Sequence, residues 1–282
     1  MSTDSFRQRV RGNRPLFGLF CMITSPQTAE ALGDSGFDFL LFDGEHTPTS
    51  LPVLQTQAAV LARSGTAFAV RVAANDATLI KPILDIGIDV LMIPDVRTAE
   101  AARAAVRAVR YPPDGIRGVG GMVRATRYGR DSGYYAQAAD KTCLVLQIES
   151  PEGLANLDAI CAVEGVDVLF FGPADLSTNM GLLVQPGAPE VVAAVTDGIR
   201  RVRAAGKAAG VLAPEALAYR YADASATMIS FGTELGLLLQ SADALARRGA
   251  QYPLGGSPAD VSSAAGVPAA AGVPSAGARG KE

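Results

Sequence analysis

The 282-residue sequence contains few of the residues on which many active sites depend: one histidine, three cysteines and four lysines. Cys21, Cys143 and Cys161 are odd in number, widely spaced and surrounded by apolar residues. This spacing excludes a disulfide framework and a cysteine-based zinc site. We expect all three to be reduced thiols in the core.

The sequence also lacks the charge and hydropathy patterns typical of nucleic-acid binding and of membrane insertion. Its 25 Lys and Arg residues against 28 Asp and Glu give a formal net charge of −3, without a long basic block. No nucleic-acid partner is therefore expected. No apolar run reaches the roughly 18 residues of a membrane span, and no secretory signal opens the chain. With 49% hydrophobic residues, we expect a soluble, cytoplasmic globular protein with no membrane partner.

The composition changes at Gly255, where Gly, Ala, Ser, Pro and Val take over and AAGVP occurs at 264–268 and again at 270–274. Such a segment has no large apolar side chains to offset the entropy of ordering. We predict a folded domain over residues 1–254 and a disordered tail over residues 255–282.

Short apolar runs recur through the predicted domain and alternate with stretches of helical character, among them 98–109, 153–161 and 233–248. The runs are 16–22, 37–42, 67–72, 88–93, 142–148, 166–171, 208–212 and 226–231. Continuous apolar runs are typical of strands buried on both faces, and their alternation with helices indicates parallel βα units. Eight such units predict a (β/α)8 TIM barrel. The doubly wound alternative needs a glycine fingerprint after an early strand, which 21–26 lacks.

Polar residues follow several of the predicted strands, at the ends that meet at the mouth of a barrel. They are Asp43, Gly44, Glu45 and His46 after the second run, Arg71 at the third, Pro94 and Asp95 after the fourth, Gln147 and Glu149 at the fifth, and Gly172 to Asp175 after the sixth. We expect the topology to bring these distant residues to one rim.

The residue types at this rim favour metal-assisted acid–base chemistry. Asp43 lies three residues before His46 and is a candidate to orient the imidazole as a general base. Two ionised carboxylates at one barrel mouth, such as Glu149 and Asp175, repel each other unless a cation or a proton lies between them. Oxygen ligands of this kind favour Mg²⁺ or Mn²⁺. Arg71 offers a planar, two-pronged donor to a substrate carboxylate or a developing enolate. The alternative is a set of unrelated salt bridges at strand ends.

Lysine placement argues against Schiff-base chemistry. Lys81 falls in a predicted helix, Lys141 and Lys207 precede strands, and Lys281 lies in the tail. None is expected at the mouth, where a Schiff-base lysine would have to lie.

Two further segments are candidate anion sites. The glycine-rich loop 115–121 precedes Arg124 and Arg127, either of which is a candidate for a distal substrate carboxylate. The turn 231–234 is followed by a predicted helix, and there Thr233 as an ordinary N-cap is favoured over an anion site.

Five ordered motifs, LLFDGEHTPTS, VRVAANDATLIKPILDIGIDVLMIP, RYPPDGIRGVGG, LVLQIESPEGLANLDAI and VEGVDVLFFGPADLS, resemble the HpcH/HpaI family of class II pyruvate aldolases from about Phe6 to Arg248. The resemblance implies a metal-dependent (β/α)8 barrel of the phosphoenolpyruvate/pyruvate type. It implies cleavage of 4-hydroxy-2-oxo acids to pyruvate and an aldehyde. It also implies a homohexamer, a trimer of dimers, with a C-terminal helix exchanged between subunits.

By the same resemblance, residues of the motifs take roles. Glu149 and Asp175 would hold the divalent metal, Mg²⁺ or Mn²⁺, with Co²⁺ or Zn²⁺ as alternatives, and His46 with Asp43 would be the base. The resemblance assigns substrate contacts to Arg71, Gln147, Gly172, Pro173, Ala174 and, from a neighbouring subunit, Asp85, with Glu45 acting through water on the metal.

Other activities and substrates stay open at this point. An oxaloacetate decarboxylase or related lyase would use the same pyruvate enolate, and a non-catalytic barrel could bind a 2-oxo acid. The segment 73–74 and the loop 181–189 depart from the family pattern, which leaves the aldehyde undefined.

Overall fold

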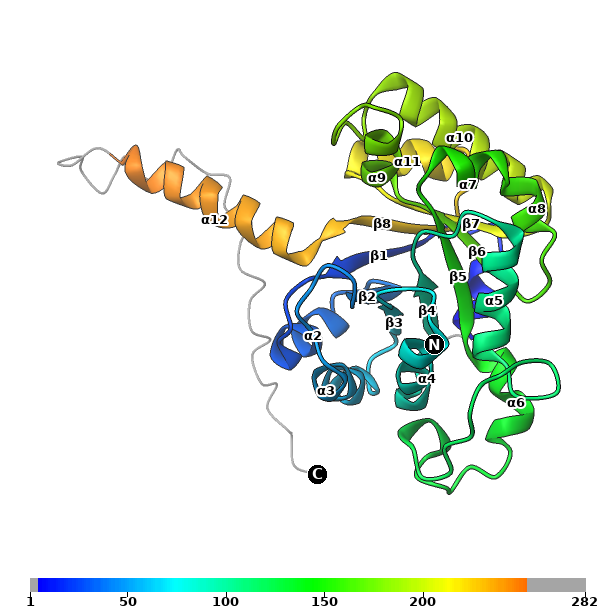
Figure 1. Ribbon diagram of the computed structural model, residues 1–282. Helices are drawn as coiled ribbons and strands as arrows, with labels where there is room; N and C mark the ends of the chain where they lie inside the picture. Colours follow the sequence, from blue (N-terminus) through cyan, green and yellow to red (C-terminus); the bar gives the residue numbers. More distant parts are fainter. Residues whose placement is uncertain (1–4, 253–282) are drawn as a thin grey trace, which may run out of the picture. The chain divides into compact units, whose positions relative to one another are not determined.

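The computed structural model describes residues 5–252. Within them, eight parallel strands close into a barrel in sequence order, which confirms the predicted TIM barrel (Figure 1). The strands are β1 (Leu16–Cys21), β2 (Phe39–Asp43), β3 (Ala67–Arg71), β4 (Val90–Ile93), β5 (Cys143–Ile148), β6 (Val168–Phe171), β7 (Ala208–Leu212) and β8 (Met228–Thr233). Each falls within or overlaps one of the eight predicted runs. The predicted tail and its boundary at residue 254 lie outside the described residues.

Helices surround the strands, as Figure 1 shows for the barrel. The helices of residues 5–252 are α1 (Phe6–Val10), α2 (Pro26–Gly33), α3 (Leu51–Leu61), α4 (Ala77–Ile86), α5 (Ala99–Val109), the 3-10 turn η1 (Arg124–Thr126), α6 (Tyr134–Lys141), α7 (Pro151–Ala155), α8 (Leu157–Cys161), α9 (Pro173–Asn179), α10 (Pro189–Ala204), α11 (Glu215–Asp223) and α12 (Glu234–Ala250). Helix α1 precedes the first strand and α12 follows the last one. The single helix expected at 153–161 is instead two short helices, because Asn156 leaves helical geometry at φ −90°, ψ 6°. Thr233 caps α12 as expected, accepting the N–H of Gly236 at 2.9 Å.

Alternation along the strands divides the apolar residues into two cores. Side chains such as Leu41, Ala69 and Val145 fill the barrel interior. Their neighbours Leu40 and Val70 face outward and pack under the helices. Cys21, Cys143 and Cys161 are free and buried, as predicted.

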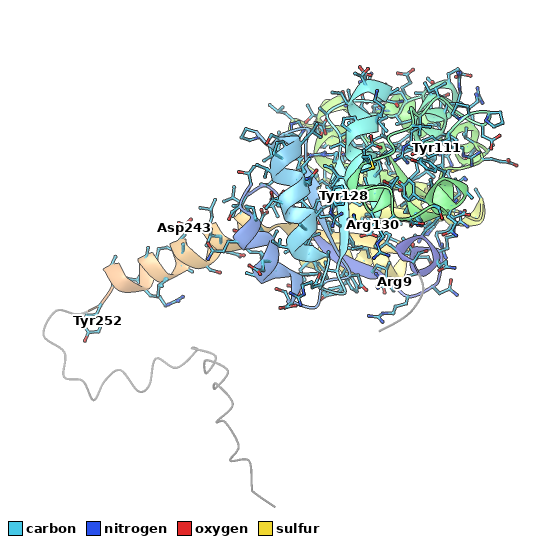
Figure 2. The ribbon with its side chains drawn as sticks, turned by 90° about the horizontal axis from the view of Figure 1, so that it is seen from below. Arg9, Tyr111, Tyr128, Arg130, Asp243 and Tyr252 are labelled. Atoms are coloured by element: carbon cyan, nitrogen blue, oxygen red, sulfur yellow. The ribbon has the colours of Figure 1, made fainter. Side chains whose placement is uncertain are left out.

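Helix α1 closes the interior at the amino ends of the strands. Phe6 and Val10 join the interior core. Arg9, marked in Figure 2, reaches Asp38 at 2.9 Å, and Arg7 reaches the buried Asp167 at 2.7 Å. With this end filled, the open end of the barrel is the one formed by the carboxyl ends of the strands.

The chain divides into a unit up to Leu239 and a second one from Gln240 onward, with α12 running through the division. None of the helices described has the length and apolar character that a membrane span requires.

Candidate active site

Inward-facing positions supply the polar residues of the barrel mouth. The interior series 39, 41 continues to Asp43, the series 67, 69 to Arg71, and the series 143, 145 to Gln147. Because every second residue faces inward, the strands that fill the core with apolar side chains end in polar ones at the rim. Asp43 and Arg71 are register partners on β2 and β3. These residues therefore meet at the mouth because side chains alternate along each strand and because neighbouring strands are in register.

Arg71 is buried and held among carboxylates. Its Nε donates to Asp43 Oδ1 at 2.8 Å and its Nη2 to Asp43 Oδ2 at 2.7 Å, a bidentate pair. Its Nη1 lies 3.0 Å from Glu45 Oε2 and 3.4 Å from Gln147 Oε1, and the guanidinium stacks 5.1 Å above the Phe20 ring. Burial alone would lower the pKa of Arg71, but the hydrogen bonds and charge of Asp43 raise it. The cation is thus fixed in place and permanently charged.

Asp43 has a different partner from the one expected. Its carboxylate is taken up by Arg71 and by the backbone N–H of Glu45 at 3.0 Å. Burial opposes ionisation, but the hydrogen bonds from Arg71 lower the pKa of Asp43 below its usual value. Within the part of the chain that the structure describes, no side-chain hydrogen bond joins Asp43 to His46. The Asp43 carboxylate therefore orients the loop that carries His46 by binding the backbone of that loop, not the imidazole.

The His46 imidazole is 60% exposed, and its Nε2 lies 3.8 Å from Glu45 Oε2. Glu45 Oε2 is itself buried and accepts no hydrogen bond of good geometry among residues 5–252. Burial raises the pKa of Glu45, opposed by the nearby charges of Arg71 and His46. An accessible imidazole beside an incompletely satisfied carboxylate is suited to moving a proton.

Glu149 follows β5 and is buried beside two other acidic groups. Burial raises its pKa to about 7, with the charge of Asp175 as the next cause and that of Glu45 as a smaller one. Its Oε1 accepts the Asp95 N–H at 2.9 Å, and its Oε2 accepts Gln147 Nε2. Burial and the neighbouring negative charges thus disfavour the ionised form of Glu149. Such a carboxylate is one that a cation would stabilise.

The acidic residues at the mouth fit a hard divalent cation. Glu149 and Asp175 lie near enough for their charges to interact, and Glu45, whose Oε2 is paired with Arg71, lies near enough to affect Glu149 as well. Carboxylate oxygens are the ligands that Mg²⁺ and Mn²⁺ prefer. No cluster of three or more His, Cys, Asp or Glu side chains at metal-binding spacing occurs among residues 5–252. Glu149 and Asp175 as a pair of protein ligands therefore stay a prediction, and two ligands would leave positions for a substrate.

Gly172, Pro173 and Ala174 lie where β6 leads into α9, beside Glu149. A Cβ atom at Gly172 would come within 2.5 Å of Glu149 Oε2 and 2.7 Å of Gln147 Nε2. A side chain at position 172 would therefore displace these two groups from their present places. The backbone that was predicted to contact substrate therefore lies against the predicted metal ligand.

Asp85 and Arg124 lie at the other end of the barrel within this chain. Asp85 is in the last turn of α4, before β4 begins, and pairs with the buried Arg117 at 3.1 Å. Arg124 donates to the main-chain oxygens of Ile86 and Ala58 at 2.8 and 3.0 Å. Arg124 is thus engaged in holding this loop, and Asp85 could approach a mouth only from a neighbouring subunit.

Three contacts at the site were not predicted from the sequence. They are the ring of Phe20 under Arg71, the Asn179 Nδ2 donation to the Glu149 main-chain oxygen at 3.0 Å, and the Asp95 N–H on Glu149. Asp95 follows an apolar run, which marked it as a rim residue, but hydrogen bonding by its backbone leaves no signal in a sequence. The three described lysines lie elsewhere: Lys81 lies within α4, Lys141 pairs with Asp131, and Lys207 donates to the main-chain oxygen of Val166.

Comparisons with known proteins agree with these features. The family model described as HpcH/HpaI aldolase/citrate lyase matches residues 16–241. A hydroxypyruvate/pyruvate aldolase from Pseudomonas aeruginosa is 45% identical over 265 residues, covering 93% of this chain and 97% of that protein. A 4-hydroxy-2-oxo-heptane-1,7-dioate aldolase from Klebsiella pneumoniae is 46% identical over 247 residues, covering 87% and 93%. The resemblance based on motifs is thereby confirmed.

Solved structures show the same fold. A HpcH/HpaI aldolase/citrate lyase family protein from Burkholderia cenocepacia superposes with a TM-score of 0.84 at 35% identity, covering 87% of this chain and 99% of that one. An HpcH/HpaI aldolase from Desulfitobacterium hafniense gives a TM-score of 0.82 at 25% identity, covering 90% and 99%.

Proposed function

Because the chain belongs to the HpcH/HpaI aldolase/citrate lyase family and is therefore a carbon–carbon lyase, we propose that it cleaves 4-hydroxy-2-oxo acids to pyruvate and an aldehyde, and forms them in reverse. We propose Arg71 and His46 as the catalytic residues, with Asp43 as the residue that positions Arg71. Glu149 and Asp175 would hold a divalent cation, Mg²⁺ or Mn²⁺, with Co²⁺ or Zn²⁺ as alternatives. Gln147, Gly172, Pro173 and Ala174 would contact the pyruvate portion.

The observation that carries the proposal is a buried, bidentate Arg71 facing acidic residues whose own environment disfavours their charge. Arg71 is 6% exposed, while burial and Asp175 raise the pKa of Glu149 to about 7. A divalent cation held by Glu149 and Asp175 would supply Lewis-acid chemistry to a 2-oxo acid. The fixed guanidinium of Arg71 and a cation bound by Glu149 would together stabilise a substrate oxygen that gains negative charge.

The residues of this chain divide the reaction between them. A nitrogen of the exposed His46 imidazole accepts the 4-hydroxyl proton, and the C3–C4 bond breaks as the aldehyde carbonyl forms. The electron pair passes to pyruvate as its enolate, and the guanidinium of Arg71 stabilises the enolate oxygen. General-base catalysis contributes roughly 10²–10⁴-fold. Electrostatic stabilisation of the enolate is the largest share.

The test is release of pyruvate from a panel of 4-hydroxy-2-oxo acids carrying different aldehyde portions, with Mn²⁺, with Mg²⁺ and after chelation. We expect release that stops with EDTA and returns with added metal. Borohydride with pyruvate should leave the protein unmodified, because no described lysine lies at the mouth. Activity that survives exhaustive chelation, or a borohydride adduct, would contradict the mechanism.

We also propose that the protein works as a homohexamer, a trimer of dimers with an exchanged C-terminal helix. Helix α12 supports this, because it exposes a series of leucines: Leu235, Leu237, Leu238, Leu239 and Leu245, at 36% to 63%. An apolar series of this kind is typical of a surface that another chain covers.

We also propose that the protein works in the cytoplasm. The free thiols of Cys21, Cys143 and Cys161 support a reducing compartment.

A further inference from the structure

The chain turns sharply after β4, at Asp95. Its φ is 48°, in the left-handed region that residues other than glycine, asparagine and aspartate rarely adopt. In an extended chain, successive N–H groups point to opposite sides. Here both point toward the β5 segment: Asp95 N–H donates to Glu149 Oε1 and Val96 N–H to Gln147 O, each at 2.9 Å. The left-handed backbone at Asp95 is what turns the two donors the same way.

The Asp95 side chain takes little part in this. Its Oδ1 accepts Arg97 Nε at 2.8 Å, but the two side chains are 45% and 46% exposed. Exposed ion pairs of this kind contribute little to stability. Position 95 therefore requires a residue that can adopt a left-handed backbone conformation. Aspartate can adopt it, whereas a β-branched residue rarely does.

The Glu149 carboxylate is held at both oxygens. Asp95 N–H holds Oε1, and Gln147 Nε2 holds Oε2. Asn179 Nδ2 holds the main-chain oxygen of the same residue at 3.0 Å. These contacts fix the side-chain rotamer and the direction in which the carboxylate lone pairs face.

We infer that Asp95 is a positioning residue, whose left-handed backbone holds Glu149 in the orientation that binds the cation. This inference rests on the proposed function, in which Glu149 is a metal ligand. Groups that orient a metal ligand change affinity by roughly 10–100-fold when they are lost. The left-handed backbone conformation of Asp95 therefore contributes to metal binding.

The experiment measures Mn²⁺ binding to the full chain by electron paramagnetic resonance or calorimetry. Asp95→Val forces a β-branched residue into the left-handed region, whereas Asp95→Gly removes the side chain and permits that conformation. We expect Asp95→Val to weaken Mn²⁺ binding by about 10-fold or more. Asp95→Gly should stay within about threefold of the wild type, because glycine still presents its N–H.

A matched control separates positioning from general strain. Ser225, with φ 79°, is exposed and precedes β8 at the opposite end of the barrel. Ser225→Val imposes the same conformational demand there, so it should lower the melting temperature and leave the Mn²⁺ dissociation constant unchanged. Equal Mn²⁺ affinity in Asp95→Val and wild type would overturn the inference. So would an equal loss of affinity in Ser225→Val.

The failure of the inference is distinguishable from failure of the proposed function. Wild-type protein that binds Mn²⁺, together with Glu149→Gln that does not, establishes Glu149 as a ligand whatever the Asp95 variants do. Wild-type protein that binds no Mn²⁺, or Glu149→Gln that binds it as tightly as wild type, overturns the metal site and the Asp95 inference with it.

Discussion

At the scale of single residues, the proposed mechanism assigns binding of negative charge and proton transfer to different side chains. Arg71 is buried and its two guanidinium edges are fixed by Asp43 and Glu45. His46 is largely exposed. An interaction with the enolate oxygen is needed by every reaction that passes through pyruvate enolate, whereas a base is needed only when a hydroxyl proton must move.

This separation predicts different losses for Arg71→Ala and His46→Ala. Arg71→Ala should depress aldol cleavage and oxaloacetate decarboxylation together. His46→Ala should lower aldol cleavage by roughly 10²-fold or more and affect decarboxylation much less, because decarboxylation removes no hydroxyl proton. Both activities are measured as pyruvate release, with melting temperatures as a check on folding. Equal losses of both activities in His46→Ala would assign the histidine to positioning instead.

Glu149 predicts a pH dependence in chelated protein. Its pKa is about 7 in the folded protein against an ordinary value of 4.5. Between these values the folded state binds more protons than the unfolded state, so stability falls as pH rises through this window. A carboxylate with a lowered pKa, such as Asp43, has the opposite effect, at lower pH.

The measurement is the melting temperature of EDTA-treated protein from pH 4.5 to 8, compared with Glu149→Gln. The wild type should lose roughly 5–10 °C relative to the variant over this range. Mn²⁺ affinity should change in the opposite sense and weaken below pH 7, because the cation binds the ionised carboxylate. A constant difference between the two proteins across the range would refute a raised pKa at Glu149.

At the scale of elements, three even-numbered strands begin alike. The segments 36–38, 87–89 and 165–167 each read Gly, an apolar residue, then Asp. In each, the Asp Oδ2 accepts an N–H from the preceding strand: Asp38 from Phe17, Asp89 from Phe68, and Asp167 from Leu144. A recurring link thus joins strand pairs at the closed end, while the varied residues of the site gather at the other.

The strands were predictable because each is buried on both faces and reads as a continuous apolar run. The rim residues were predictable because parallel strands end together. The partner of Asp43 was not, since His46 is near in sequence but Arg71, 28 residues away, is its neighbour by register. The division between α7 and α8 and the left-handed turn at Asp95 depend on single backbone torsions. Tertiary contacts set these torsions, so the local sequence does not reveal them.

At the scale of the whole molecule, the proposed oligomer bears on whether one chain holds a complete site. Asp85 lies in the last turn of α4, at the end of the barrel opposite His46, and its partner there is Arg117. If Asp85 acts on substrate, as the family resemblance implies, it acts at the mouth of a neighbouring subunit. A symmetric assembly repeats this arrangement at every site.

Shared sites predict that two inactive variants restore activity when mixed. His46→Ala and Asp85→Ala should each lose most aldol cleavage. In oligomers re-formed from an equal mixture, about a quarter of the sites combine the intact His46 of one chain with the intact Asp85 of its neighbour. Pyruvate release should therefore recover toward about a quarter of the wild-type rate, while each variant re-formed alone stays inactive. The mixture is prepared by dissociation and reassembly, and its oligomeric state is checked by light scattering. A mixture no more active than its parents, despite confirmed mixed oligomers, would show that Asp85 serves no neighbouring site.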